Sequence, residues 1–270
     1  MSSLLIGGAG LVGSHVANRI QSIVVDDLSR GSFANICCDH ITASVTEYDL
    51  MDVLIERSDN VFFFAAIPVL DCDKDPEHAR AVMIDGLAHV SDCCRHYGKR
   101  LIYSSSGSVY GENISATEDS PLLGDTLYAL MKIEAEDVLT HSRCDFIGLR
   151  YQSVYGVAVQ TGYKAVIQKF RETAGKLPVY GDGSQSYDFI SAHDVAKANI
   201  LAAESKCSGF YNIGTGKQTT VLELANMIGE PEFVEGPTPI KHMGCDPSKA
   251  ERDFGFRYEI ELKDWLACAV

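Results

Sequence analysis

The first half of the chain alternates short apolar segments with segments whose apolar residues recur at helical spacing. Pro76–Tyr97 carries an apolar side chain every three or four residues, and Leu127–Thr140 repeats that pattern. The predicted strands are Ser3–Ile6, Ile23–Val25, Ile41–Ala43, Val61–Phe64, Leu101–Ser104 and Phe146–Arg150. Short strands that alternate with helices are typical of a parallel sheet with crossover helices. The pattern therefore predicts an α/β fold with a Rossmann-type doubly wound parallel sheet.

Beyond Tyr155 the pattern becomes irregular, with glycine and proline residues between the predicted helices. These helices lie near Ala165–Ala174, His193–Ala203 and Val221–Ile228. The sequence has no repeat and no clean linker. We therefore expect a sheet domain over residues 1–152, to which the chain returns at about residues 188–203, and a smaller C-terminal lobe over residues 153–270.

The composition is that of a soluble globular enzyme. The 270 residues are 46% hydrophobic and 22% charged, which is enough to form a sizeable core. The formal net charge of −14 lacks the basic footprint of a nucleic-acid-binding protein and disfavours anionic membranes. We expect a small-molecule ligand and neither nucleic acid nor membrane as a partner. An anionic ligand must be held by local donors rather than by the overall field.

The N-terminus and the cysteines favour an intracellular protein. The N-terminal segment has neither a basic region nor a long apolar run, and no segment approaches the roughly 18 apolar residues of a membrane span. The nine cysteines include two adjacent pairs but no CxxC pair, a spacing that suits neither a zinc site nor a small disulfide framework. We expect reduced thiols, a cytoplasmic location and no metal.

A glycine-rich segment directly follows the first predicted strand. Leu4–Ile6 runs into Gly-Gly-Ala-Gly-Leu-Val-Gly over residues 7–13, and a helix is predicted to follow. In such a segment Gly7 permits a tight turn, Gly10 lets backbone N–H groups approach a pyrophosphate, and Gly13 allows close helix–strand packing. The N-terminus of the helix adds oriented donors for the phosphates. The segment predicts a dinucleotide site.

The second predicted strand ends in Asp26-Asp27, at about the spacing expected for an acid that binds the adenosine ribose. A carboxylate there accepts hydrogen bonds from the two ribose hydroxyls and repels a 2′-phosphate. This favours NAD over NADP as the cofactor. Arg30 is close enough in the sequence to leave NADP open.

Tyr128 and Lys132 are four residues apart in a predicted helix, so their side chains lie on one face. A phenol with a pKa of about 10 is a poor base at neutral pH, but a nearby ammonium and a positive nicotinamide favour the phenolate. This helix follows the strand that ends in Ser104-Ser105-Ser106. Strand ends open into the ligand crevice of a doubly wound sheet, where Ser106 would share the reacting hydroxyl proton with Tyr128. The alternative is that the serines only form a turn.

With these residues the chain resembles the extended short-chain dehydrogenase/reductases of the NAD-dependent epimerase/dehydratase family, over nearly its whole length. Six further segments carry the resemblance, each in the family's order: Val61–Ala66 (VFFFAA, similar to VFHLAA), Ser104–Gly111 (SSSGSVYG, similar to ASSSAVYG), Leu149–Gly156 (LRYQSVYG, similar to LRYxNVYG), Val179–Ile190 (VYGDGSQSYDFI, similar to VYGDGxQxRDFI), Tyr211–Gly216 (YNIGTG, similar to YNVGTG) and Asp246–Ala250 (DPSKA).

The resemblance implies an NAD-binding Rossmann domain over residues 1–152 and a substrate-binding lobe over residues 153–270. It also implies a nucleoside-diphosphate sugar as substrate. In a 4-epimerase, Tyr128 removes the C4 hydroxyl proton, NAD+ takes the hydride, and the 4-keto sugar turns before reduction on its other face. Ser106, Tyr128 and Lys132 would be the catalytic residues.

The same resemblance assigns binding residues. The cofactor would be contacted by Gly7, Gly10, Leu11, Val12, Gly13, Asp26, Asp27, Leu28, Ser29, Ser44, Val45, Ala65, Ala66, Ser104, Tyr128, Lys132 and Tyr151. The substrate would be contacted by Ser108, Ser153, Val179, Tyr180, Tyr187 and Lys241.

The residues after Ser106 favour an epimerase over a dehydratase. Sugar 4,6-dehydratases that resemble this family have Asp-Glu there, because expelling water needs a further acid and base, and decarboxylases keep a Glu at the second position. This chain has Gly107 and Ser108 instead. Helices Pro76–Tyr97 and Leu127–Thr140 pack on the sheet and could also form a homodimer interface, so we expect a homodimer.

The departures from the family lie mainly on the substrate side. Tyr187 stands where the family has an arginine that clamps the substrate diphosphate, Gly236 aligns with the second clamp arginine, and Ser153 replaces an asparagine. A phenol cannot replace the bidentate bonds of a guanidinium. The cations that could compensate are Lys164, Lys169, Arg171 and Lys241. Three further departures touch the cofactor side: Ser44, Phe63 and Met83.

The sequence therefore predicts an NAD-dependent nucleoside-diphosphate sugar epimerase. Two alternatives stay open: a dehydratase or net dehydrogenase acting on a related sugar nucleotide, and a non-catalytic NAD-binding protein on the same fold.

Overall fold

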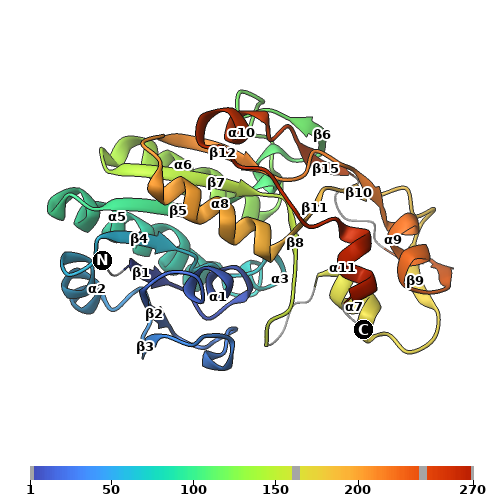
Figure 1. Cartoon of the computed structure of the whole chain (residues 1–270), viewed down its shortest axis with the longest axis horizontal. Helices are drawn as coiled ribbons and strands as arrows, with labels where there is room; N and C mark the ends of the chain where they lie inside the picture. Colours follow the sequence, from blue (N-terminus) through green and yellow to red (C-terminus); the bar gives the residue numbers. More distant parts are fainter. Residues whose placement is uncertain (1–2, 160–164, 237–241, 269–270) are drawn as a thin grey trace.

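The computed structural model describes residues 3–159, 165–236 and 242–268. Its centre is a sheet of seven parallel strands in the order β12-β7-β5-β4-β1-β2-β3 (Figure 1). The strands are β1 (Ser3–Ile6), β2 (Ser22–Asp26), β3 (Asp39–Thr42), β4 (Asn60–Phe63), β5 (Arg100–Ser106), β7 (Asp145–Tyr151) and β12 (Gly209–Ile213). The six predicted strands are all present, each within two residues of its expected ends, so the predicted doubly wound sheet is confirmed.

Helices cover both faces of the sheet, because each strand sends alternate apolar side chains into two separate cores. In β1, Leu5 belongs to one core, whereas Leu4 and Ile6 belong to the other. The helices are α1 (Leu11–Ala17) and α8 (Ala192–Glu204) over the first core, and α2 (Tyr48–Glu56), α5 (Gly86–Tyr97) and α6 (Leu127–Ser142) over the second. Figure 1 shows α8 crossing the sheet near β5 and β7.

The helix predicted over Pro76–Tyr97 is present but contains a π-helical turn. α4 (Pro76–Arg80) leads into this turn at Ala81–Asp85, and α5 continues from it. The sequence pattern does not predict α2, in which Met51 and Ile55 are buried and Leu50 and Leu54 pack partly buried against the same core. Its apolar residues form a short, nearly continuous run, whose periodicity does not distinguish a helix from a strand.

The sequence pattern also does not predict β12, which lies at the edge of the main sheet beside β7. The chain thus returns to the sheet beyond the expected segment at residues 188–203. The division at residue 152 stays a prediction. α10 (Ser248–Phe254) contacts β12, so residues late in the chain also belong to this domain.

The remaining elements form the smaller lobe. A core of Tyr155, Ile167, Phe170, Leu177 and Val179, with further residues of α9, holds it together. Its elements are β8 (Ser153–Tyr155), α7 (Val166–Glu172), β9 (Leu177–Tyr180), β10 (Ser186–Tyr187), β11 (Phe189–Ser191), β13 (Thr219–Thr220), α9 (Val221–Ile228), β14 (Pro231–Val234), β15 (His242–Cys245) and α11 (Leu262–Cys268). β6 (Asn113–Ala116), from the first half, pairs with β15, and α3 (Val69–Cys72) follows β4. In the part of the chain that the structure describes, no helix is long and apolar enough to cross a membrane.

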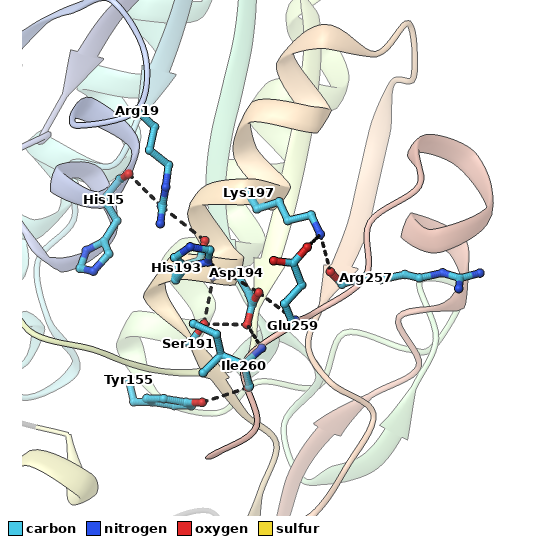
Figure 2. A network of polar contacts seen from close by, with 10 residues as sticks. All are labelled: His15, Arg19, Tyr155, Ser191, His193, Asp194, Lys197, Arg257, Glu259 and Ile260. Carbon is cyan, nitrogen blue, oxygen red and sulfur yellow. Dashed lines mark hydrogen bonds and ion pairs between the residues drawn. The ribbon is translucent and has the colours of Figure 1, made fainter. Parts of the chain in front are cut away.

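A buried carboxylate joins the first turn of α8 to the C-terminal segment (Figure 2). Asp194 is fully buried, and its oxygens accept hydrogen bonds from the Ser191 hydroxyl at 2.7 Å, the Glu259 N–H at 3.0 Å and the Ile260 N–H at 3.1 Å. Lys197, one turn further along α8, forms an ion pair with the Glu259 side chain. Because α8 packs on the sheet and the C-terminal segment continues into α11, this network holds the lobe against the sheet domain.

We expect Asp194→Ala to lower the free energy of unfolding by about 2–4 kcal/mol, because it leaves two backbone N–H donors without acceptors. Urea denaturation followed by circular dichroism measures the change. His193→Ala, at the exposed neighbouring position, is the control and should change stability by less than about 0.5 kcal/mol. Equal stability of the two variants would contradict a structural role for Asp194.

Candidate active site

The glycine-rich turn between β1 and α1 lies tightly against the end of β4. Gly7 has φ +76°, and a Cβ built on it would lie 2.4 Å from the Ala65 backbone nitrogen, so only glycine fits. A Cβ built on Gly10 would meet nothing within 4 Å. The turn is therefore packed on one side and open at Gly10, as a backbone that receives a pyrophosphate must be. The residues present fit a dinucleotide.

Asp26 links this turn to the end of β2. Its two carboxylate oxygens accept hydrogen bonds from the Ala9 and Leu28 N–H groups, each at 2.9 Å. Burial raises the pKa of Asp26, and the two N–H donors oppose that shift. Each oxygen retains a lone pair for a further donor, such as a ribose hydroxyl. Asp27 is exposed and accepts hydrogen bonds from the Ser29 N–H and hydroxyl.

Arg30, which leaves NADP open in the sequence, forms an ion pair with Asp71 of α3. Lys74 contacts the other oxygen of that carboxylate at 2.7 Å. Asp71 thus holds the Arg30 guanidinium, and the three groups together carry one net positive charge.

The other predicted cofactor residues surround the same edge of the sheet. Leu28 has a left-handed backbone with φ +59°, which its hydrogen bond to Asp26 supports. Ser44 is partly exposed after β3, and its hydroxyl contacts Thr46 at 2.8 Å. The Val45 side chain is only 4% exposed and packs against Gly86, so it is not available for direct contact with a ligand. The remaining positions are Leu11 and Val12 at the start of α1 and Ala65 and Ala66 after β4.

Tyr128, Lys132 and Ser106 come together at the carboxyl end of β5. The Tyr128 hydroxyl lies near the Ser106 hydroxyl, which lowers the pKa of the phenol. The Lys132 ammonium lies 5.7 Å from the centroid of the Tyr128 ring and donates a hydrogen bond to the Ser104 carbonyl at 2.7 Å. α6 begins at Leu127 because Thr126 caps it, with the Thr126 hydroxyl accepting from the Ala129 N–H.

Burial shifts the pKa values of both catalytic candidates away from ionisation. Desolvation raises the pKa of Tyr128 to about 12, although the nearby Ser106 hydroxyl lowers it. Desolvation lowers the pKa of Lys132 to about 8, against the opposing effect of Glu136. In the protein alone Tyr128 is therefore a neutral phenol at pH 7. A cationic partner is needed to make it a base.

Tyr151, predicted to contact the cofactor, lies at the end of β7 and is mostly buried. Its hydroxyl donates a hydrogen bond to Asn199 of α8 at 2.8 Å. Burial raises the pKa of Tyr151. This hydroxyl is thus engaged on the α8 side of the sheet.

Two residues that the sequence analysis does not single out, Glu136 and Gln152, lie near this group. Glu136 is one turn after Lys132 in α6, and its carboxylate receives both a bidentate contact from Arg150 and a hydrogen bond from Ser105. The repeated spacing of four residues, from Tyr128 to Lys132 to Glu136, is the signal that could have identified Glu136.

The Gln152 amide fills the space beside Gly107. A Cβ built on Gly107 would lie 2.3 Å from Gln152 Nε2, and one built on Gly214 would lie 2.8 Å from Gln152 Cγ. Gln152 is 3% exposed, and neither amide atom has a hydrogen bond of good geometry among the described residues. The Cys245 thiol also contacts the amide, but a thiol is too weak a partner to satisfy it. An acidic side chain at position 107 therefore has no room while Gln152 keeps this position.

The predicted substrate residues lie at different depths. Ser108 donates its hydroxyl to the Ser106 hydroxyl at 2.9 Å, and Ser153 lies in β8 with its N–H bound to the Asp188 carbonyl. Tyr180 is 45% exposed, and Tyr187 is partly buried with its ring 5.9 Å from Phe189. Val179 is fully buried in the lobe core, so its side chain is not available to a ligand. Lys241 lies outside the described residues, as does Lys164.

A cavity of about 430 Å³ separates the glycine turn from the lobe. It extends from Leu11 past Tyr155 of β8 to α7 and α11. Arg171 is among its lining residues, with its guanidinium carbon 5.1 Å from the centroid of the Trp265 ring. Of the cations that could compensate for the missing clamp arginines, Arg171 is thus placed at a cavity between the two parts of the protein.

His193, Asp194 and Glu259 bring three potential metal ligands within 4.8 Å of one another. Asp194 already accepts three hydrogen bonds, and Glu259 is paired with Lys197. Figure 2 shows the Asp194 carboxylate directed toward Ser191 and the backbone of Glu259 and Ile260. The group is therefore a structural network.

The seven-stranded parallel sheet, the glycine turn and the Tyr128–Lys132 pair together define the class of protein as an extended short-chain dehydrogenase/reductase. The sequence profile of the NAD dependent epimerase/dehydratase family matches residues 3–214. The chain belongs to this family, as its motifs predict.

Relatives are similar over nearly the whole chain. A putative UDP-glucose 4-epimerase of Methanocaldococcus jannaschii is 30% identical in an alignment of 292 positions, gaps included, that covers 97% of this chain and 95% of the relative. The structure of a UDP-glucose 4-epimerase of Thermotoga maritima with UDP-glucose has a TM-score of 0.91 at 28% identity, covering 98% of this chain and 96% of that one. A UDP-glucose 4-epimerase of Thermus thermophilus in complex with NAD has a TM-score of 0.88 at 26% identity, with 100% of both chains covered.

We expect Gly107→Asp to lower the free energy of unfolding by about 1–3 kcal/mol, because the new side chain meets the Gln152 amide. Adding Gln152→Ala should recover at least half of that loss, which a double-mutant cycle measures by urea denaturation. Gly10→Ala, where a Cβ meets nothing, is the control and should leave stability nearly unchanged. Additive effects of the 107 and 152 substitutions would show that Gln152 does not restrict this position.

Proposed function

We propose that the protein is an NAD-dependent nucleoside-diphosphate sugar epimerase that acts at C4 of the sugar through a 4-keto intermediate. The observation that carries this proposal is the placing of Tyr128 and Lys132 on one face of α6 at the end of β5, where Lys132 lies 5.7 Å from the centroid of the Tyr128 ring and bonds to the Ser104 carbonyl. The similarity to UDP-glucose 4-epimerases over nearly the whole chain supports it.

The cofactor would be held by the glycine turn and by the acids that follow β2. Gly7 and Gly10 let the backbone approach the pyrophosphate, and Asp26 and Asp27 offer acceptors to the ribose hydroxyls. A carboxylate at this place repels a 2′-phosphate, which favours NAD over NADP. Bound NAD would supply the reversible oxidation of the sugar carbon.

Tyr128 would move the proton of the reacting hydroxyl. Its pKa of about 12, with Lys132 already in place, must fall for this role, and a positive nicotinamide would lower it. Ser106 would hold the hydroxyl in place and share its proton, since its own oxygen accepts from the Ser108 hydroxyl and N–H. Lys132 is fixed for this purpose by its bond to the Ser104 carbonyl.

An epimerase is favoured over a dehydratase by the residues after Ser106. Elimination of water needs a further acid and base near the sugar, and positions 107 and 108 carry no carboxylate. Gln152 also fills the space that a side chain at position 107 would occupy. A net dehydrogenase and a non-catalytic NAD-binding protein remain as alternatives that the experiments below separate.

The substrate diphosphate would lie between the glycine turn and the lobe. Tyr187 and Tyr180 would contact the nucleotide, and Arg171 at the cavity offers a guanidinium in place of the missing clamp arginines. Ser153 and Ser108 offer hydroxyls near the sugar. The protein would act in the cytoplasm as a homodimer, with α5 and α6 at the interface, where Leu130 is half exposed.

We expect Tyr128→Phe to lower kcat for sugar-nucleotide epimerisation by about 100- to 10,000-fold, because no group then transfers the hydroxyl proton. NAD binding, measured by calorimetry, should stay within about threefold of the wild type. Full activity of the variant would contradict the mechanism.

A thermal-shift panel of UDP-, dTDP-, GDP- and CDP-sugars with NAD present should identify the nucleotide. A ligand at 100 times its Kd stabilises the fold by about 2.7 kcal/mol, and the melting temperature rises accordingly. Absorbance at 340 nm then separates the enzyme classes, since an epimerase returns its cofactor to NAD+ and a net dehydrogenase accumulates NADH. Binding of NAD without a shift or turnover on any sugar nucleotide would favour the non-catalytic alternative.

A further inference from the structure

Three consecutive residues of β5 each contact a successive turn of α6. The Ser106 hydroxyl lies near Tyr128, the Ser104 carbonyl accepts from Lys132 at 2.7 Å, and the Ser105 hydroxyl donates to Glu136 at 2.5 Å. Tyr128, Lys132 and Glu136 are spaced by four residues, so they form one row along the helix. The strand end and the helix are thus aligned at three points.

The third contact is the most constrained of the three. Arg150 is the register partner of Ser105 on the neighbouring strand β7, and both side chains reach the Glu136 carboxylate. Arg150 Nε donates to Glu136 Oε1 at 2.9 Å, and Nη2 donates to Oε2 at 2.6 Å. Glu136 is 3% exposed and Arg150 is 4% exposed. A buried bidentate pair tolerates little displacement, because any shift leaves a charge without its partner.

The Arg150 guanidinium is itself fixed on its other side. Nη1 donates to the Tyr110 hydroxyl at 2.7 Å and to the Glu118 carbonyl at 3.3 Å. The Tyr110 hydroxyl in turn donates to the Asn212 side chain in β12 at 2.7 Å. Glu136 therefore binds to a cation of β7 that is also held by Tyr110 in the turn after β5 and, through Tyr110, by Asn212 of β12, and α6 takes its position along the sheet from that cation.

We propose that Glu136, held by Arg150 and Ser105, is a positioning residue for the reaction, fixing α6 along β5 so that Tyr128 meets Ser106 and Lys132 meets the Ser104 carbonyl. The inference rests on the proposed epimerase function. A displacement of about 1 Å at a reacting group can cost about 100-fold in rate. A helix that slid by a fraction of its rise would move both catalytic candidates together.

The test is Glu136→Gln in the full chain with NAD bound. The amide keeps the shape of Glu136 but presents N–H donors to Arg150 Nη2, so the bidentate contact is lost. We expect kcat to fall about 10- to 100-fold while KM for the sugar nucleotide and NAD occupancy change less than about threefold. Ser105→Ala, which removes one hydrogen bond, should lower kcat about 3- to 10-fold.

Glu134→Gln is the matched control, because Glu134 lies on the same helix and pairs with Arg80 at the surface. It should leave kcat unchanged. If Glu136→Gln does not fold, the charge-free double variant Glu136→Met with Arg150→Met is measured in its place, because a buried ion pair can be replaced by apolar residues without loss of stability. It should melt near the wild-type temperature and still show the reduced kcat.

Wild-type kcat in a folded Glu136→Gln variant would overturn the inference alone, as would full kcat in the charge-free variant. If Glu134→Gln lowers kcat as much as Glu136→Gln does, the inference is also overturned. Absence of turnover in the wild-type protein on any sugar nucleotide would contradict the proposed function and this inference with it. Misfolding of Glu136→Gln leaves the decision to Ser105→Ala and the charge-free variant.

Discussion

Two opposite charges, those of Arg150 and Glu136, lie buried between the sheet and the helix that carries Tyr128. Taking these charges out of water costs several kcal/mol for each, which only close and complete pairing offsets. The pair therefore determines where β7 and α6 can lie relative to each other. Through Ser105 it includes β5, and through Tyr110 and Asn212 it extends to the edge strand β12. The carboxyl edge of this half of the sheet is organised around that pair.

The other half of the same edge is organised by a backbone constraint. Gly7 brings the turn after β1 within contact of the backbone after β4, and Asp26 binds the turn to the end of β2. Parallel strands all end at one edge, so the turn and the Tyr128 group face a common crevice although their sequences are more than 100 residues apart. A cofactor that reaches from the turn to the phenol is the chemical counterpart of this arrangement.

Local patterns in the sequence predict six of the seven strands of the main sheet, the glycine turn and the spacing of Tyr128 and Lys132, because each depends on neighbours within a few residues. α2 is not predicted because its apolar residues form a short, nearly continuous run, and β12 is not predicted because it follows the lobe in the sequence. Contacts between strands are not predicted from the sequence for a different reason. The pairing of Arg150 with Glu136 depends on the register of β5 and β7, and the contact of Gln152 with Gly107 depends on their adjacent ends. A single sequence carries neither register.

The two sides of the crevice differ in the donors that they offer to an anion. The net charge of −14 repels an anionic substrate at long range, so binding must come from donors at short range. On the cofactor side the backbone of the glycine turn supplies such donors without any side chain. On the lobe side the aligned arginine position is Tyr187, and Arg171 stacks over Trp265 at the cavity instead. The Arg171 guanidinium carbon lies 5.1 Å from the centroid of the Trp265 ring, so packing against that ring helps to position the side chain at the cavity. The short-range donors for an anion therefore differ between the two sides: backbone N–H groups at the glycine turn and a guanidinium at the lobe.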